Sequence, residues 1–365
     1  MKQSLNRQMH CLLALLLLVV IQRSGYSQQA KNNDTSHDFI LGAYYFDGWN
    51  EGSHHITSDL KEYYKMREPV WGWVTSTSDI VDSQIKAAAD AGIKFFAFDW
   101  YFRNGTDDYP LNHALNLYLL SPDKNRLKFC LMVANHDPFV IGPDNWDAAS
   151  KIWIKLFKSS GYLTVNKRPL IIFFSPSSLI EHFGSAAKVK EAFASLRDEA
   201  RKEGLGGVSI AACVYNNVKD VGDADACGFD VMTGYNYHGY GLQKGREVTP
   251  IDSMQVADRR VWDGIRDRSS KPYIPVATLN WDPRPWRPDT AFVPHFSGYS
   301  MQSVYRSVMA LRKWTSKNAR HTPKEKIALM YAWNENGEGG WLTPSHMLKD
   351  SLLLGIKHAL GKESK

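Results

Sequence analysis

Short apolar runs alternate with longer amphipathic segments along most of the chain. This alternation is typical of β/α units, whose parallel strands are buried on both faces and therefore read as nearly continuous apolar runs. The chain contains eight such runs, and we predict strands over residues 40–46, 95–100, 129–134, 170–174, 208–214, 231–235, 273–279 and 327–333. Eight strands with intervening helices predict an α/β fold of the (β/α)8 type, a TIM barrel.

The segments between the runs have helical patterns. Two of them are followed directly by Gly92 and Gly204, as expected at helix C-termini. The predicted helices cover residues 79–91, 147–158, 187–203, 252–266, 303–315 and 351–360. Because no linker rich in Pro, Gly or Ser interrupts this order, we predict one barrel domain over residues 38–362.

The beginning of the chain has the layout of a secretory signal peptide. A basic start precedes an apolar run over residues 11–21, which is followed by small residues at Gly25 and Ser27. We therefore expect residues 1–27 to be cleaved near Ser27, residues 28–37 to be flexible, and the mature protein to be secreted or periplasmic. The apolar run is shorter than the roughly 20 residues of a spanning helix, so we expect no transmembrane segment in the mature chain.

Charge and cysteine content exclude some partners. The net charge of +6 falls to +3 without residues 1–27, which contain three basic residues and no acidic one. A chain so close to neutral, with no basic stripe, is not expected to bind nucleic acid. Cys213 and Cys227 are the nearest pair for a disulfide, but buried free thiols are the alternative because Cys130 and Cys213 lie in apolar runs.

Acids, amides, imidazoles and aromatic rings gather where the predicted strands end, which is where TIM-barrel active sites lie. Polar groups of this kind bind hydroxyls, and aromatic faces cover the C–H surface of a sugar. Any one aromatic residue could instead plug the barrel, and an acid at a strand end could cap a helix. We expect an oligosaccharide or polysaccharide to bind Asp47, Trp49, Asp99, Trp100, Asn135, His136, Tyr235, Asn236, His238, Trp281, Asp282, Arg284, Asn334 and Trp341.

Two glutamates, Glu335 and Glu338, follow the last predicted strand within a glycine-rich turn. Glycosidic cleavage uses two carboxyl groups, and the glycines allow a bend and a close approach of substrate. Two like charges held together raise the pKa of one of them, so that it can act as an acid near neutral pH. We predict that they are the catalytic pair; two solvated glutamates in a polar turn are the alternative.

Neither a cofactor nor a catalytic metal is expected. His54 and His55 are adjacent, but neighbouring residues of an extended segment point in opposite directions, and no third ligand has a suitable spacing.

The segment 333–341 resembles the Asn-Glu-Trp-x-Glu-Gly signature of glycoside hydrolase family 99, the endo-α-mannosidase group, and of the related WbsX-like family of bacterial polysaccharide proteins. Asn336 stands where that signature has tryptophan, and the segment 42–49 is only loosely similar. The resemblance extends over most of the mature chain, through residues 85–102, 129–136, 161–174 and 275–284.

This resemblance implies a retaining glycoside hydrolase that acts on an α-linked glycan. Glu335 would deprotonate the sugar 2-hydroxyl, whose oxygen would attack the anomeric carbon and form a 1,2-anhydro sugar. Glu338 would protonate the leaving oxygen and then activate water. A directly nucleophilic glutamate is the alternative mechanism.

Two other functions compete with hydrolysis. One is a non-catalytic glycan-binding barrel, and the other is a WbsX-like glycosyltransferase. The export signal argues against the transferase, because nucleotide sugars are cytoplasmic, and the chain has no phosphate-binding Gly-rich loop.

Overall fold

The structure is a computed structural model that describes residues 39–287 and 290–361. The predicted signal peptide and the segment 28–37 lie outside these residues. Eight parallel strands form the central sheet, and they confirm the eight predicted runs and the predicted barrel. The strands are β1 (Ile40–Tyr45), β2 (Phe95–Trp100), β3 (Lys128–Val133), β5 (Arg168–Phe173), β6 (Ser209–Cys213), β7 (Val231–Thr233), β9 (Val276–Thr278) and β11 (Ile327–Tyr331).

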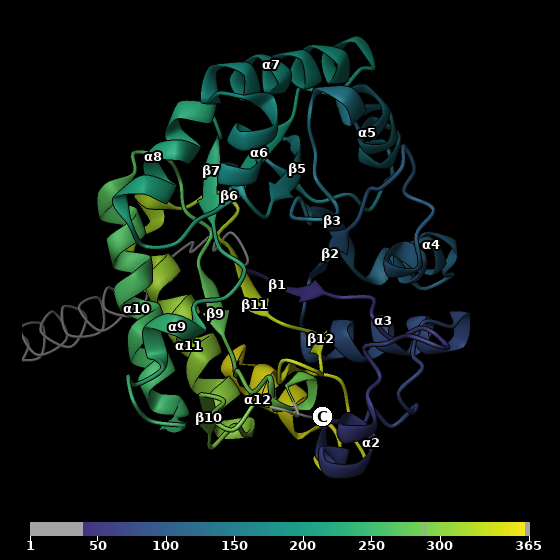
Figure 1. The fold of residues 1–365 in the computed structure, drawn as a ribbon, viewed down its shortest axis with the longest axis vertical. Coiled ribbons are helices and arrows are strands. Elements are labelled where there is room, and N and C mark those ends of the chain that lie inside the picture. The colour runs from purple at the N-terminus through teal and green to yellow at the C-terminus, as the bar shows by residue number, and fades with distance from the viewer. Residues whose placement is uncertain (1–38, 288–289, 362–365) are drawn as a thin grey trace, which may run out of the picture. The chain divides into compact units, whose positions relative to one another are not determined.

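The strand order is β7-β6-β5-β3-β2-β1-β11-β9, and the central strands pair in parallel. The gap between the two ends of this order is bridged by Met232 of β7 and Tyr273, which comes just before β9. The backbone N–H of Ile274 donates to the carbonyl of Met232 at 2.9 Å. The sheet is therefore a nearly closed barrel, with its strands at the centre of Figure 1.

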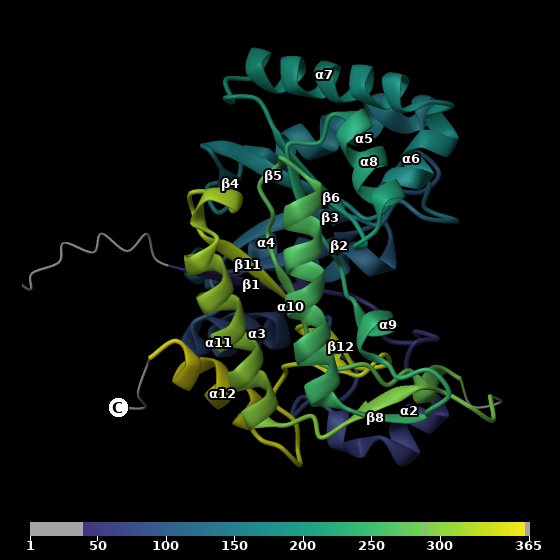
Figure 2. The same cartoon turned by 90° about the vertical axis from the view of Figure 1, so that its left-hand side faces the viewer.

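Helices surround these strands in Figures 1 and 2. The helices that follow the eight barrel strands are α3 (Ser78–Ala91), α4 (His113–Leu120), α5 (Pro143–Phe157), α6 (Pro176–Phe183), α7 (Ala186–Lys202), α8 (Val218–Cys227), α10 (Ile251–Arg268), α11 (Met301–Lys317) and α12 (Ser351–Ala359). The six predicted helices are present. The sequence analysis missed α4, α6 and α8, which are short; α6 begins at Pro176 directly after the strand end, with Ser175 as its N-cap.

Shorter elements decorate the carboxyl ends of the strands. They include helices α2 (Ser58–Tyr63) and α9 (His238–Gly241) and the parallel pair β8 (Val248–Pro250) and β10 (His295–Ser297). The antiparallel strand β4 (Thr164–Val165) lies instead at the opposite end of the barrel, where it pairs with the first residues of β5. The loops also contain single-turn 3-10 helices, of which η1 (Lys65–Arg67) and η4 (Arg284–Trp286) matter for the site. A two-residue antiparallel pair, β12 (Asn334–Glu335) and β13 (Gly340–Trp341), forms what we call the carboxylate hairpin, residues 334–341.

The alternation of side chains along each strand decides which of them enter the barrel. In β2, Asp99 contacts Tyr235, which follows β7, across the interior. Its neighbour Trp100 points the other way and packs on Trp153 of α5, with ring centroids 5.6 Å apart. This is the period-two geometry of a strand that is buried on both faces.

The described residues contain neither a disulfide nor a helix suited to span a membrane. Cys130, Cys213 and Cys227 are free and buried, so the predicted alternative of buried thiols is the one observed. Across residues 39–287 and 290–361, no helix combines the length and apolarity needed to span a membrane.

Candidate active site

The carboxylate hairpin is held at the end of the barrel by hydrogen bonds of the Asn334 side chain and of the backbone. The side-chain amide of Asn334 accepts a hydrogen bond from the backbone N–H of Phe46 at 2.9 Å and donates one to the Phe46 carbonyl at 2.7 Å. These two bonds join the hairpin to the end of β1. Within the hairpin, the N–H of Gly339 donates to the carbonyl of Glu335 at 2.8 Å. The N–H of Asp282 donates to the carbonyl of Glu338 at 2.6 Å. Both glutamates are thus placed by neighbouring barrel strands.

The hydroxyl of Tyr235 links two buried carboxyl groups. It lies 2.7 Å from Oδ2 of Asp99 and 2.7 Å from Oε1 of Glu335. Asp99 is 3% exposed and Glu335 is 5% exposed, and the second oxygen of each is buried without a hydrogen-bond partner. Buried polar atoms are usually paired, so an unpaired carboxyl oxygen at Glu335 is an acceptor ready for a ligand hydroxyl.

Glu338 is half-buried and accepts a hydrogen bond from the hydroxyl of Tyr331, the last residue of β11. Burial raises the pKa of Glu338 to about 7, while the Tyr331 hydrogen bond and the charge of Arg287 oppose this rise. A carboxyl with a pKa near neutrality can both donate and accept a proton at physiological pH.

The other two carboxyl groups are also perturbed. Burial, and then the charges of Glu338 and Asp99, raise the pKa of Glu335 well above its ordinary value, and the Tyr235 hydrogen bond opposes them. Burial and the charge of Glu338 raise the pKa of Asp99 in the same direction. The two glutamates are therefore close enough to influence each other's ionisation, as paired catalytic carboxyls do.

Asp282 is occupied by two arginines. Arg67 of η1 forms a buried ion pair with it and donates to the carbonyls of Asp282 at 2.9 Å and Asn336 at 3.0 Å. Arg284 contacts the same carboxylate at 2.7 and 2.9 Å. Burial raises the pKa of Asp282, but hydrogen bonding from Arg284 and the charges of both arginines outweigh it and leave the pKa below its ordinary value. The two arginines thus favour the charged form of Asp282, which anchors the hairpin.

Two glycines of the hairpin are required by the packing. A Cβ atom on Gly337 would lie 1.9 Å from Cε2 of Trp286, so the Trp286 ring occupies the space that we had expected for substrate. Gly339 has a φ of +86° and its Cβ would meet the backbone nitrogen of Asp282 at 2.9 Å. The group that approaches Gly337 closely is thus the Trp286 side chain of η4.

A second polar group lies beside the carboxyls. The imidazole of His238 stacks on Trp281, with ring centroids 3.6 Å apart and an interplanar angle of 2°. Its Nδ1 lies 2.6 Å from the amide oxygen of Asn236. Burial and the charge of Arg287 lower the pKa of His238 to about 4. This imidazole is therefore neutral near pH 7, and it forms a flat polar surface together with Trp281.

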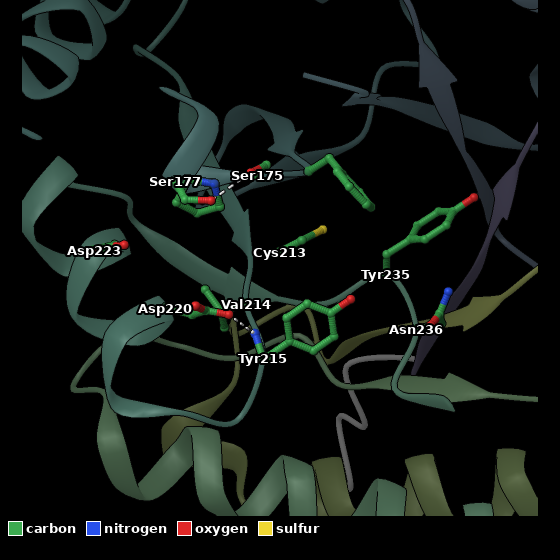
Figure 3. A pocket seen from close by; sticks show the side chains of 11 residues that line it. Ser175, Ser177, Cys213, Val214, Tyr215, Asp220, Asp223, Tyr235 and Asn236 are labelled. Atoms are coloured by element: carbon green, nitrogen blue, oxygen red, sulfur yellow. Dashed lines mark hydrogen bonds between the residues drawn. The ribbon is translucent and has the colours of Figure 1, made fainter. Parts of the chain in front are cut away.

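A pocket opens at the carboxyl ends of β5, β6 and β7, as Figure 3 shows. Tyr235 forms one wall, so the pocket adjoins the Asp99–Glu335 pair. Tyr215 is 49% exposed and presents its ring to the pocket. The lining combines aromatic, hydroxyl, amide and carboxyl groups from Phe174, Ser175, Pro176, Ser177, Cys213, Val214, Tyr215, Asp220, Asp223, Tyr235 and Asn236.

Some predicted site residues have side chains committed elsewhere. Trp49 and Trp100 have no exposed surface and pack in hydrophobic clusters. Trp100 points away from the barrel interior onto Trp153, and the indole N–H of Trp49 donates to the backbone carbonyl of Asn334 at 2.8 Å. Both carboxylate oxygens of Asp47 accept hydrogen bonds, from Ser76 and from the backbone of Ala114. We therefore remove Trp49, Trp100 and Asp47 from the substrate-contacting set.

Four more predicted residues shape or flank the site. The Asn135 amide bonds the backbone of Ser175 in both directions, at 2.7 and 3.0 Å. Asn334 is engaged with the Phe46 backbone, and Trp341 is 1% exposed under Arg67. His136 is exposed at the rim. Of the predicted set, the structure brings Asp99, Tyr235, Asn236, His238, Trp281, Glu335 and Glu338 to one end of the barrel.

The sequence analysis missed Arg67 and Tyr331. Tyr331 could have been found, because it ends the strand that precedes the hairpin. No local signal identifies Arg67, which lies 215 residues before its partner Asp282.

Comparison with known proteins agrees with this architecture. The family described as "Glycosyltransferase WbsX" matches residues 58–355. Two curated proteins, each called uncharacterized protein WxcX and belonging to two strains of Xanthomonas campestris pv. campestris, are 24% identical over 316 residues. The matched region covers 78% of this chain and 41% of each relative, so the chain spans well under half of their length.

Solved structures share the fold at low sequence identity. A GH99 endo-alpha-mannosidase from Bacteroides thetaiotaomicron has a TM-score of 0.62 and 12% identity, covering 88% of this chain and 96% of that chain. A glycoside hydrolase-like protein has a TM-score of 0.63 and 15% identity, covering 88% and 94%. These similarities show that the chain has a glycosidase-like barrel.

Proposed function

Because this chain belongs to the family described as Glycosyltransferase WbsX and has a glycosidase-like barrel, we propose that it is a glycoside hydrolase that cleaves an α-linked glycan. One observation carries the proposal. Two glutamates with raised pKa values, Glu335 and Glu338, lie together beside a pocket with aromatic and polar walls. This is the constellation that glycosidic cleavage needs.

In the proposed mechanism, Glu335 is the base. Its Oε1 is bonded to Tyr235, while its buried Oε2 has no partner. The 2-hydroxyl of a bound sugar would donate to Oε2 and pass its proton to Glu335. The freed oxygen would attack the anomeric carbon as the bond to the leaving oxygen breaks, which gives a 1,2-anhydro sugar. Water would then open this ring at the anomeric carbon while Glu335 returns its proton to the 2-oxygen, so that two inversions retain the configuration and Glu335 is restored.

Glu338 is the acid in the same step. Its pKa of about 7 leaves a proton available near neutral pH, and it would transfer that proton to the leaving oxygen. It would then take a proton from the attacking water. Direct attack by one glutamate on the anomeric carbon remains the alternative route to retention.

The walls of the pocket suit a neutral sugar. The exposed ring of Tyr215 offers a face for the C–H surface of a pyranose, and Ser175, Ser177 and Asn236 offer hydroxyl and amide groups. One structural neighbour is named an endo-alpha-mannosidase, so α-mannose-containing glycans are the first substrates to examine.

The test is hydrolysis of a panel of α-mannan, rhamnose-rich and host glycans by the purified protein, with the products separated and identified. Glu338→Gln should lower kcat by about 10²–10⁴, the usual contribution of a general acid, while glycan binding measured by calorimetry persists. Glu203→Gln, which changes an exposed glutamate paired with Lys158, is the matched control. Undiminished hydrolysis by Glu338→Gln would overturn the catalytic assignment.

Two other candidates have distinct outcomes in these experiments. The family description favours a glycosyltransferase, which would transfer sugar from a nucleotide sugar to an acceptor and release nucleotide. The pocket of Figure 3 is lined by Asp220 and Asp223 and by no Lys or Arg, which disfavours a diphosphate there. Glycan binding without turnover across the panel would indicate a non-catalytic binding barrel.

Export is part of the proposal. N-terminal sequencing of the mature protein from the periplasm or culture medium tests it, and the expected new terminus lies near Ser27. An intact N-terminus in a cytoplasmic fraction would contradict export.

A further inference from the structure

The hydroxyl of Tyr235 has two carboxyl neighbours but only one hydrogen. Oδ2 of Asp99 and Oε1 of Glu335 each lie 2.7 Å from its oxygen. An ionised carboxylate only accepts hydrogen bonds, so Tyr235 can donate to one of these groups and not to both. The second contact needs a hydrogen of its own. One of the two carboxyl groups must therefore be protonated and donate to Tyr235.

Asp99 has surroundings that disfavour its anion. It is 3% exposed, and its Oδ1 is buried without a hydrogen-bond partner. Burial raises its pKa well above the ordinary value, and the Tyr235 hydrogen bond is the only opposing contact. The titratable groups around it come from the carboxyl ends of β2, β6, β7 and β11 and from the carboxylate hairpin. They are neutral or acidic: Tyr101, Cys213, Tyr235, Tyr331, Glu335 and Glu338.

We propose that Asp99 is a neutral carboxylic acid that donates to the Tyr235 oxygen and thereby turns the Tyr235 hydrogen toward Glu335. The choice of Asp99 over Glu335 as the protonated partner rests on the proposed function, in which Glu335 must be free to accept the proton of a sugar hydroxyl. Asp99 is then a positioning residue, because it acts on the reaction only through Tyr235. We had expected it to bind sugar directly.

The arrangement makes Glu335 a defined base. A neutral Asp99 removes one of the two charges that raise the pKa of Glu335, and a hydrogen bond from Tyr235 stabilises the Glu335 carboxylate. During the reaction, Glu335 gains the proton of the sugar hydroxyl. Asp99 and Tyr235 each keep their own hydrogen, so no further acceptor or donor is required.

Substitutions at Asp99 separate this role from sugar binding and from simple packing. Asp99→Leu keeps the branched shape of the side chain but lacks a donor, and kcat/KM should fall by at least tenfold. Asp99→Asn is neutral at every pH and its amide can donate to Tyr235, so it should restore most of that loss. The acidic limb of the kcat/KM profile of Asp99→Asn should coincide with that of the wild type, because no charge has been removed.

An ionised Asp99 would shift the pH profile of Asp99→Asn in a direction that can be predicted. If Asp99 is an anion, Asp99→Asn removes a negative charge beside Glu335, lowers the pKa of Glu335, and moves the acidic limb to lower pH. That movement, or a failure of Asp99→Asn to exceed Asp99→Leu, would refute the proposal. Tyr235→Phe is the control, since loss of its hydrogen bond to Glu335 should move the limb to higher pH.

An optical measurement tests the proton without any substrate. The infrared spectrum of the wild type minus that of Asp99→Asn, recorded at neutral pH, should contain the carbonyl band of a buried protonated carboxylic acid. If this band is present but the protein hydrolyses no glycan of the panel, Asp99 is protonated as proposed and the proposed function is wrong. Hydrolysis without the band would reject the assignment and sustain the function.

Discussion

Arg67 is expected to be the main anchor of the carboxylate hairpin, and Arg67→Ala tests this. The Arg67 side chain is 2% exposed and its ion pair with Asp282 is buried, whereas the Arg284 side chain on the same carboxylate is 39% exposed. Arg67 also donates to the backbone carbonyls of Asp282 and Asn336. It therefore joins the hairpin, which contains Asn336, to the loop that contains Asp282.

The two arginines should differ in their contribution to stability. Removing one partner of a buried ion pair costs ~3–5 kcal/mol. Because Asp282 keeps Arg284 in the Arg67→Ala variant, we expect the low end, about 3 kcal/mol. Arg284→Ala removes a more exposed partner, for which about 0–1 kcal/mol is usual.

Urea denaturation measures the unfolding free energy of both variants, provided that its dependence on urea concentration has the same slope in each. Thermal unfolding should show a Tm that is several degrees lower for Arg67→Ala. Hydrolysis by the folded Arg67→Ala protein should also fall, since the hairpin positions both glutamates. If Arg67→Ala is no less stable than Arg284→Ala, the buried pair does not anchor the hairpin and this reasoning is wrong.

Two further predictions concern the same hairpin. The proposed acid is the protonated form of Glu338, whose pKa is about 7, so kcat/KM should decline as pH rises through about 7. Tyr331→Phe removes a hydrogen bond that lowers this pKa, so the basic limb should move to higher pH; a limb that stays in place would contradict the role of Glu338. Gly337→Ala forces its methyl group against Trp286 and should cost ~1–3 kcal/mol in unfolding free energy, as overpacking does. Gly239→Ala, whose added Cβ meets nothing within 4 Å, is the control, and equal stability of the two variants would refute the packing argument.

The sequence by itself determined the barrel and most of its periphery. Eight continuous apolar runs can be buried on both faces only in a covered parallel sheet, and the glycines after residues 79–91 and 187–203 mark helix ends that the structure contains. The helices α4, α6 and α8 were missed because they have only eight, eight and ten residues, too few turns for a helical period to stand out in the sequence.

Sequence also identified the part of the chain with the candidate chemistry, because residues at the carboxyl ends of barrel strands must lie at one end of the barrel. It did not decide which side chains meet there. Asp99 and Trp100 are adjacent in sequence, yet one enters the barrel and the other packs on α5. The direction of each side chain depends on the register of its strand within the closed sheet.

Only the tertiary structure decided the contacts between distant segments. Arg67 meets Asp282 across 215 residues, and Tyr235 lies between Asp99 and Glu335, which are 136 and 100 residues away from it. Such contacts depend on the three-dimensional closure of the barrel, and residue type or local spacing does not encode them. The raised pKa values of the carboxyl groups have the same origin, since desolvation and neighbouring charge exist only after the strands have brought these groups together.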